Sequence, residues 1–129
     1  MNMTKEDFFR QLEQIYKEGM QQDVEAFLNQ CLRDTAHGCS ICFNPVEISV
    51  CNEFGVFYRS INEFRKAKEM FEAAKNLIEM HLGKKTIQYA AVMNNLSMVC
   101  QDTGQYAQAE DLRAEAARLF EVLGEERNV

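Results

Sequence analysis

One stretch of this chain repeats another at a fixed distance, and this repetition restricts the possible folds more than any other feature of the sequence. The two stretches begin at Cys51 and Met93. Sequences that repeat every ~20–50 residues build stacks of similar units, in which each unit buries its apolar face against the next. The matching positions lie 42 residues apart and are Asn52 and Asn94, Phe64 and Tyr106, Ala67 and Ala109, and Ala74 and Ala116.

Each repeated unit has the apolar periodicity of helices. In the second half of each unit, apolar residues recur in steps of three and four, which places them on one face of a helix. One proline and six glycines in 129 residues agree with a chain built of few, long helices. The periodic positions are Phe64, Ala67, Phe71, Ala74, Leu77, Ile78 and Leu82, and then Tyr106, Ala109, Leu112, Ala116, Leu119, Phe120 and Leu123.

Capping and turn residues set the helix boundaries. Asn44 can cap a helix whose first residue is Pro45, and Thr86 can cap a later helix. Gly83 and Gly124 suit helix C-termini, where the chain turns left-handed. We therefore expect six helices, at residues 4–18, 21–36, 45–60, 63–82, 87–102 and 105–123.

The N-terminal region is interpreted as a degenerate copy of the same unit. Gly19 and Asn62 are 43 residues apart, and so are Val24 and Ala67. A terminal unit diverges because one of its faces meets water. The sequence thus predicts one all-α domain over 1–129, with a degenerate first repeat at 4–36, a second repeat at 45–82 and a third repeat at 87–124.

These units resemble the tetratricopeptide repeat, a helix pair with small residues where its two helices touch and large residues between them. The resemblance implies antiparallel helix pairs stacked as a right-handed superhelix of about three repeats. The long helices are similar to those of kinesin-light-chain repeats and of bacterial tetratricopeptide repeat proteins of unassigned role. The residues that carry the resemblance are Gly55, Tyr58, Phe64, Ala67, Phe71 and Ala74, and then Leu96, Ser97, Gly104, Tyr106, Ala109 and Ala116.

Two positions allow a physical interpretation of their own. Gly55 lies inside a predicted helix, where glycine costs about 1 kcal/mol relative to alanine. We expect this cost to be offset by the close approach of a neighbouring helix. Arg113 stands where Phe71 stands one unit earlier, which predicts that this face of the last helix meets solvent. A second copy of the chain, or further chain, could then cover the outer face of the last helix pair.

In the family that these units resemble, the first helix of each pair lines a concave groove that binds a partner protein. By resemblance, Val56 and Met98 stand where the family's carboxylate clamp carries an asparagine. The groove therefore suits an amphipathic helix or an extended peptide. The groove positions implied by the resemblance are Ser49, Asn52, Glu53, Val56 and Arg59 in one unit, and Ala91, Asn94, Asn95, Met98 and Gln101 in the next.

The asparagines Asn52 and Asn94 occupy matched positions, although asparagine is a poor helix former. Their amides can hold an extended peptide backbone, because an amide donates and accepts hydrogen bonds at once. They can equally bond to neighbouring helices or face water. The sequence leaves both interpretations open.

Charge and motifs argue against several functions. A net charge of −6 without a basic stripe argues against nucleic acid as the ligand. No apolar run approaches the ~18 residues of a membrane helix, and the N-terminus lacks a signal-peptide pattern. We therefore expect a cytoplasmic protein without a membrane partner. Paired histidines, a glycine-rich phosphate loop and a Gly-x-Ser-x-Gly motif are absent from the sequence, so we expect neither an enzyme nor a cofactor.

A short segment with His37, Cys39 and Cys42 carries possible ligand chemistry. A Cys-x-x-Cys pair beside a histidine can bind zinc or sense redox state, with Cys51 as a fourth ligand. No second pair follows, so ordinary loop and core thiols explain the pattern better. Of the remaining functions we expect a protein-binding adaptor or scaffold, with a self-assembling homodimer as the alternative.

Overall fold

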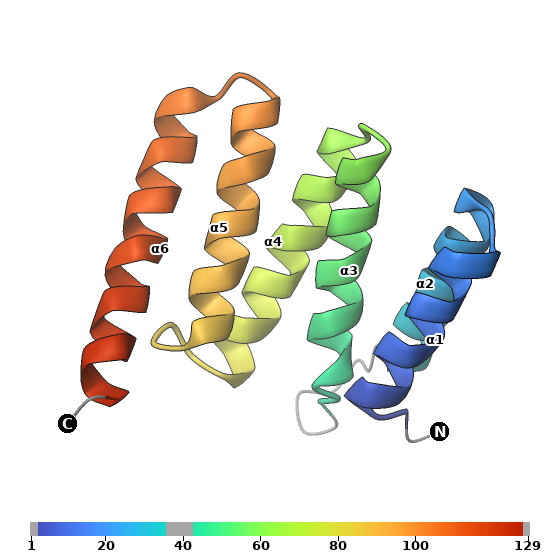
Figure 1. Cartoon of the computed structure of the whole chain (residues 1–129). Coiled ribbons are helices and arrows are strands. Elements are labelled where there is room, and N and C mark those ends of the chain that lie inside the picture. Colours follow the sequence, from blue (N-terminus) through green and yellow to red (C-terminus); the bar gives the residue numbers. More distant parts are fainter. Residues whose placement is uncertain (1–2, 36–42, 128–129) are drawn as a thin grey trace.

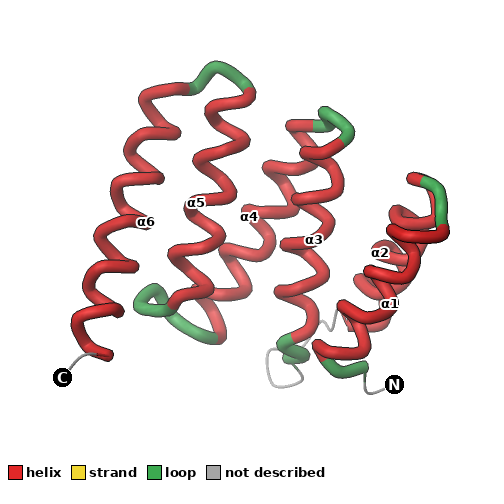
Figure 2. Tube along the Cα trace, in the orientation of Figure 1, coloured by secondary structure: helices red, strands yellow, loops and turns green. Residues whose placement is uncertain are grey.

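Six helices form the described part of the chain. The computed structural model describes residues 3–35 and 43–127, and these contain helices and loops but no strand (Figure 2). The predicted all-α fold is confirmed, and every predicted boundary but the last lies within one residue of the observed one. The helices are α1 (Lys5–Glu18), α2 (Gln21–Thr35), α3 (Val46–Ser60), α4 (Phe64–His81), α5 (Ile87–Asp102) and α6 (Tyr106–Arg127).

The helices form three pairs that are stacked along one direction. Helix α1 pairs with α2, α3 with α4, and α5 with α6, while α2 also packs against α3 and α4 against α5. Figure 1 shows α1, α3 and α5 side by side, with α2 and α4 behind them and the two termini at opposite ends of the stack. The first helices of the three pairs therefore share one face of the molecule.

Residues with left-handed backbone close the turns of the second and third units, whereas Gly19, the matched position in the first unit, is extended (φ −98°). Asn62 (φ 64°) lies before α4, and Gly104 (φ 83°) lies before α6, 42 residues later. Gly83 (φ 93°) follows α4. Asparagine and glycine adopt this conformation at the lowest cost. The repeat is thus present in the turns as well as in the helices.

Thr86 caps α5 as predicted, while α3 begins one residue later than predicted, with Pro45 at its N-cap position. Asn44 Oδ1 accepts a hydrogen bond from the Val46 amide at 3.0 Å, and Thr86 Oγ1 accepts one from the Tyr89 amide at 3.1 Å. Each bond satisfies a donor that the first helical turn leaves without a partner.

The predicted helix end at Gly124 is wrong. Helix α6 continues through Gly124 to Arg127, and the φ of this glycine is not positive. Glutamate and arginine, which follow it, are good helix formers. Their propensity offsets the cost of one glycine, so the glycine alone does not end the helix.

A close contact between α3 and α4 depends on Gly55. A β-carbon built on Gly55 would lie 2.5 Å from Cε1 of Phe71, far inside van der Waals contact. Phe71 is buried, and so are Ala67 and Ala74, which lie one turn to either side of it on α4. The expectation that Gly55 permits close helix approach is confirmed.

Two apolar cores fill the stack, and α3 contributes to both. Because α3 lies between the cores, its position relative to α4 affects the packing of the whole stack. The first core consists of Phe8, Leu12, Val24, Leu28, Cys31, Val46, Val50, Phe54 and Phe57. The second consists of Cys51, Ala67, Phe71, Ala74, Ile78, Tyr89, Val92, Met93, Leu96, Val99 and Ala116.

Gly55→Ala should destabilise the protein, even though alanine is the better helix former. The added methyl group overlaps the Phe71 ring, and overpacking a core costs about 1–3 kcal/mol. This exceeds the ~1 kcal/mol that the helix gains from the replacement. Urea unfolding at equilibrium measures the net change.

Gly124→Ala is the matched control for this prediction. A β-carbon at Gly124 meets no atom within 4 Å, so the same replacement should stabilise the protein by up to about 1 kcal/mol. Equal effects at Gly55 and Gly124 would contradict the close contact.

Candidate partner-binding groove

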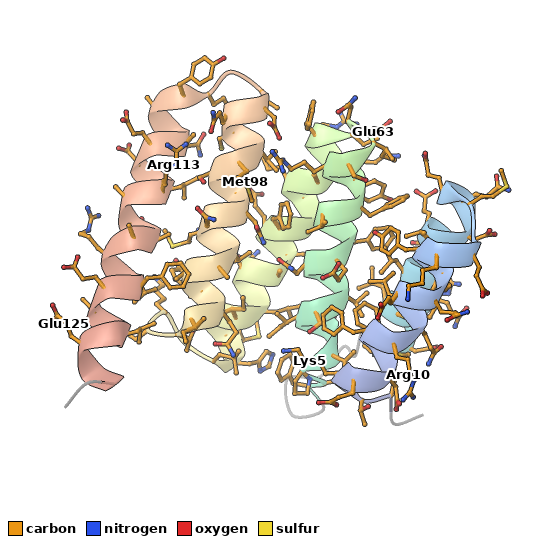
Figure 3. All side chains as sticks on the ribbon, viewed as in Figure 1. Lys5, Arg10, Glu63, Met98, Arg113 and Glu125 are labelled. Carbon is orange, nitrogen blue, oxygen red and sulfur yellow. The ribbon has the colours of Figure 1, made fainter. Side chains whose placement is uncertain are left out.

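The surface formed by α1, α3 and α5, called the groove below, contains the residues that the resemblance assigned to partner binding. They come from two helices of that face, and Figure 3 marks Met98 on α5 among them. Val56 is exposed, while Met98 is half-buried. The structure thus brings the predicted residues onto neighbouring helices, and their individual contacts decide what each can do.

An amide bridge joins α3 to α5 across the groove. Asn95 Nδ2 donates a hydrogen bond to Asn52 Oδ1 at 2.7 Å, and both side chains are half-buried. Asn94, which matches Asn52 in the repeat, is exposed instead. Of the two interpretations that the sequence left open, a bond to a neighbouring helix is the one found at Asn52. Its partner is Asn95, the residue after the matched position.

A charged bridge joins the same two helices about two turns farther along α3, between Arg59 and Asp102. Arg59 Nε and Nη2 donate to the Asp102 carboxylate at 2.5 and 3.3 Å. This forked geometry is the stronger form of an arginine–carboxylate pair. Nearby, Arg113 Nη2 donates to Gln101 Oε1 at 2.9 Å. Arg59 and Gln101, both assigned to partner contact from the sequence, therefore already have partners within the chain.

Two hollows lie on either side of the amide bridge. The Val56 hollow has a volume of about 380 Å³ and lies between the C-terminal halves of α3 and α5. The Phe9 hollow has a volume of about 170 Å³ and lies between their N-terminal halves, beside α1. Val56, Arg59, Ser60, Asn62, Phe64, Phe71, Met98 and Asp102 line the first. Lys5, Phe9, Ile48, Ser49, Asn52, Ala74, Ile78, Gln88, Ala91 and Val92 line the second.

Residues of α1 in the groove were missed by the sequence-based prediction. Phe9 and Lys5 line the Phe9 hollow, and the Tyr16 ring lies two turns farther along α1, 48% exposed. The signal was available, since Phe9 and Tyr16 lie 43 residues before Asn52 and Arg59. This is the same separation that relates Gly19 to Asn62.

Glu53 places a carboxylate at the boundary between α3 and α1. Its side chain is half-buried, and burial raises the pKa of this carboxyl above its usual value. Burial also raises the pKa of the Tyr16 hydroxyl, with the charge of Glu53 as a further cause. Within residues 3–35 and 43–127, Glu53 forms no ion pair and no hydrogen bond through its side chain. The groove therefore contains a partly desolvated negative charge.

The described cysteines are buried and unreactive. Cys31, Cys51 and Cys100 are free thiols inside the cores. Burial, with a smaller effect of the Glu47 charge, raises the pKa of Cys51 to about 12. Burial also raises the pKa of Cys31 to about 11. Because the thiolate is the nucleophilic and metal-binding form, these thiols are inert at neutral pH.

The segment with His37, Cys39 and Cys42 lies outside the described residues. Within the described ranges, no three histidine, cysteine, aspartate or glutamate side chains are placed to hold a metal ion. None of the described helices combines the length and the apolarity that a membrane span requires.

Asn52→Ala should destabilise the protein by about 0.5–1.5 kcal/mol, because it leaves the half-buried amide of Asn95 without its partner. Asn95→Ala should cost a similar amount. The double variant should cost less than the sum of the two single variants, since the bond is lost only once. Urea unfolding of wild type, both single variants and the double variant completes this double-mutant cycle.

Asn94→Ala is the control for the amide bridge. Its side chain is exposed, so its removal should change stability by less than about 0.5 kcal/mol. Additive losses at Asn52 and Asn95 would show that the two amides do not interact.

Comparison with known proteins identifies the repeat. Residues 48–124 match the model of the tetratricopeptide repeat family, which is more than half of the chain. Among solved structures, the chain is similar to BtubC (BKLC) from P. vanneervenii, with a TM-score of 0.77 and 20% sequence identity. The match covers 92% of this chain and 46% of that one. No relative was found among curated proteins.

At this sequence identity, the likeness to BtubC shows the fold alone, and the chain spans less than half of the length of BtubC. The family match covers nearly all of α3 to α6, where the sequence itself shows the repeat. The resemblance predicted from the sequence is therefore confirmed, and the chain belongs to the tetratricopeptide repeat family.

Proposed function

We propose that this chain is an adaptor or scaffold that binds a peptide or a helix of another protein in the groove. Repeat stacks of this family generally serve protein–protein interaction. The observation that carries the proposal is the pair of hollows on either side of the Asn52–Asn95 bridge. Apolar side chains such as Phe9 and Val56 are exposed there, and contact with a partner would remove them from water.

The spacing of the hollows suits a helical or an extended ligand. Ile48 and Val56 mark the two hollows on α3, and eight residues of helix span about 12 Å. A bound helix covers that distance with apolar side chains about seven or eight residues apart. An extended peptide covers it with side chains about four residues apart. Either ligand can place one apolar side chain in each hollow.

The proposal includes no catalytic step. The described thiols are buried, and their pKa values are raised. The polar residues of the groove form bonds between helices at Asn52 and Arg59. Such bonds fix the shape of a binding surface. We accordingly propose that the chain acts by binding alone, without a cofactor and without nucleic acid as its ligand.

Val56→Glu and Met98→Glu should each weaken peptide binding at least tenfold, about 1.4 kcal/mol. The probes are peptides selected from a random library against the wild-type protein. A charge in the Val56 hollow would lose water on peptide binding without gaining a partner. Fluorescence anisotropy of labelled peptides measures the affinities.

Met80→Glu is the matched control, because Met80 is an exposed methionine on α4, 67% accessible. It should leave the affinities unchanged. Selected peptides that bind the Val56→Glu and Met98→Glu variants as tightly as the wild type would refute the groove as the binding surface.

One observation favours self-assembly as a second candidate function. Of the described side chains of α6, only Ala109 and Ala116 are buried, while Phe120 and Val122 are each 43% exposed. A hollow of about 520 Å³ lies between α5 and α6 at the C-terminal end of the stack. It is lined by Lys84, Lys85, Tyr89, Met93, Glu115, Arg118, Leu119, Val122 and Leu123.

A second copy of the chain could cover this face with twofold symmetry. A twofold interface brings the same surface of both copies together. Glu115 and Arg118 lie one turn apart on α6, so each could pair with the opposite charge of the other copy. Burial of Leu119 and Val122 would supply the apolar contact.

Light scattering should then show a dimer that Leu119→Glu converts to a monomer. The variant should bind groove peptides with unchanged affinity, because Leu119 lies outside the groove. Met80→Glu should remain a dimer. A wild-type protein that stays monomeric over the whole micromolar range would refute self-assembly, whereas the proposed peptide binding would remain.

A further inference from the structure

We propose that the groove binds a cationic side chain of the partner, a lysine or an arginine, between the Glu53 carboxylate of α3 and the aromatic rings of Phe9 and Tyr16 on α1. This inference rests on the proposed function and deepens it. It assigns the partner a basic residue next to the apolar residues that enter the two hollows.

The charge of Glu53 is not balanced by another charge within the described ranges. Its carboxylate is half-buried, and it forms no ion pair or hydrogen bond within the described ranges. Partial removal of a charge from water has a cost that an opposite charge or hydrogen-bond donors offset. Lys5 also lines the Phe9 hollow, but it forms no ion pair with Glu53. Arg59 is engaged by Asp102.

Two aromatic side chains of α1 face the same part of the groove: Tyr16 is close enough to Glu53 to feel its charge, and Phe9 lines the Phe9 hollow. Phe9 and Tyr16 lie two turns apart on α1, and both are exposed, at 37% and 48%. The face of an aromatic ring attracts a cation, and the attraction grows when the cation is partly desolvated. The Tyr16 hydroxyl is protonated at neutral pH, as tyrosine ordinarily is, and burial raises its pKa further. The ring therefore adds no second negative charge.

Elsewhere the chain places a cation, a tyrosine and a glutamate together, although there the tyrosine hydroxyl also bonds to the glutamate, which Tyr16 and Glu53 do not do. Lys66 Nζ lies 5.5 Å from the centroid of the Tyr58 ring. The Tyr58 hydroxyl donates a hydrogen bond to Glu25 Oε2 at 3.1 Å. Here a cation, a tyrosine and a glutamate from three helices stabilise one another. The groove has the tyrosine and the glutamate, in Tyr16 and Glu53, and the partner would supply the cation.

The partly buried charge of Glu53 also affects stability. The raised pKa of Glu53 means that folding disfavours its charged form. The cost is fully present above the pKa of the folded state, and it disappears as the pH falls below the unfolded value of about 4.3. At neutral pH Glu53 thus opposes folding of the free protein. A binding role explains a charge at such a position.

The experiment measures how tightly wild type and Glu53→Gln bind peptides selected from a random library. Only peptides whose affinity Val56→Glu lowers are used, because they bind in the groove. These peptides should be enriched in lysine or arginine. Glu53→Gln should weaken their binding about tenfold, and replacing the basic residue by norleucine should weaken it equally. The two changes together should cost no more than either alone. Added salt should also lower the affinity.

Stability separates a binding role from a structural one. Glu53→Gln should raise the Tm at neutral pH, and the increase should vanish near pH 4. Glu69→Gln, at an exposed position of α4, should change neither the affinity nor the Tm. A lower Tm for Glu53→Gln would assign Glu53 to the fold and overturn the inference.

The remaining outcomes distinguish this inference from the proposed function. Peptides that lack a basic residue, and whose affinity falls with Val56→Glu but not with Glu53→Gln, would overturn the inference and leave groove binding intact. Peptides whose affinity changes with neither Val56→Glu nor Glu53→Gln would overturn both the proposed function and this inference.

Discussion

The close contact of Gly55 with Phe71 is the constraint on which the rest of the stack depends. It brings α3 near to α4, and because α3 contributes to both cores, it fixes how the first pair meets the second. The equivalent positions in the next unit are Ser97 and Arg113. Ser97 is buried and small, while Arg113 is exposed and bonds to Gln101. Without an aromatic ring at Arg113, the outer face of α6 has less to bury.

Both bridges of the groove join a residue of α3 to the residue of α5 that follows its 42-residue repeat match. Asn52 meets Asn95 and Arg59 meets Asp102, and each pair is 43 residues apart. These bonds hold two first helices at a fixed separation, so they define the hollows between them. The polar residues with partners in the chain shape the surface, and the side chains without partners are free to contact a ligand. Glu53 belongs to the second group, and the Phe9 and Tyr16 rings are exposed for contact, although Phe9 also packs edge-on against Phe8.

The fold was predictable because helix periodicity, caps and turns act locally. Thr86 and Gly83 marked helix ends correctly and Asn44 did so to within one residue, whereas Gly124 did not, since a single glycine does not outweigh the helix formers after it. The sequence predicted which helices form the groove, but not which of their side chains contact one another. A repeat offset aligns Asn52 with Asn94, yet the rotation of α5 relative to α3 brings Asn95 to Asn52. That rotation is set by tertiary packing, which no local pattern records.

The groove consists of residues that bridge helices, such as Asn52 and Asn95, and residues that are free to bind a ligand, such as Glu53. The most direct test of this division is an NMR titration with a groove-binding peptide that follows side-chain signals. We expect the amide signals of Asn52 and Asn95 to keep their hydrogen-bonded shifts, while the ring signals of Phe9 and Tyr16 move in proportion to the bound fraction. Release of the Asn52–Asn95 bond on peptide binding, with unchanged ring signals, would contradict this division. The asparagines would then contact the ligand themselves.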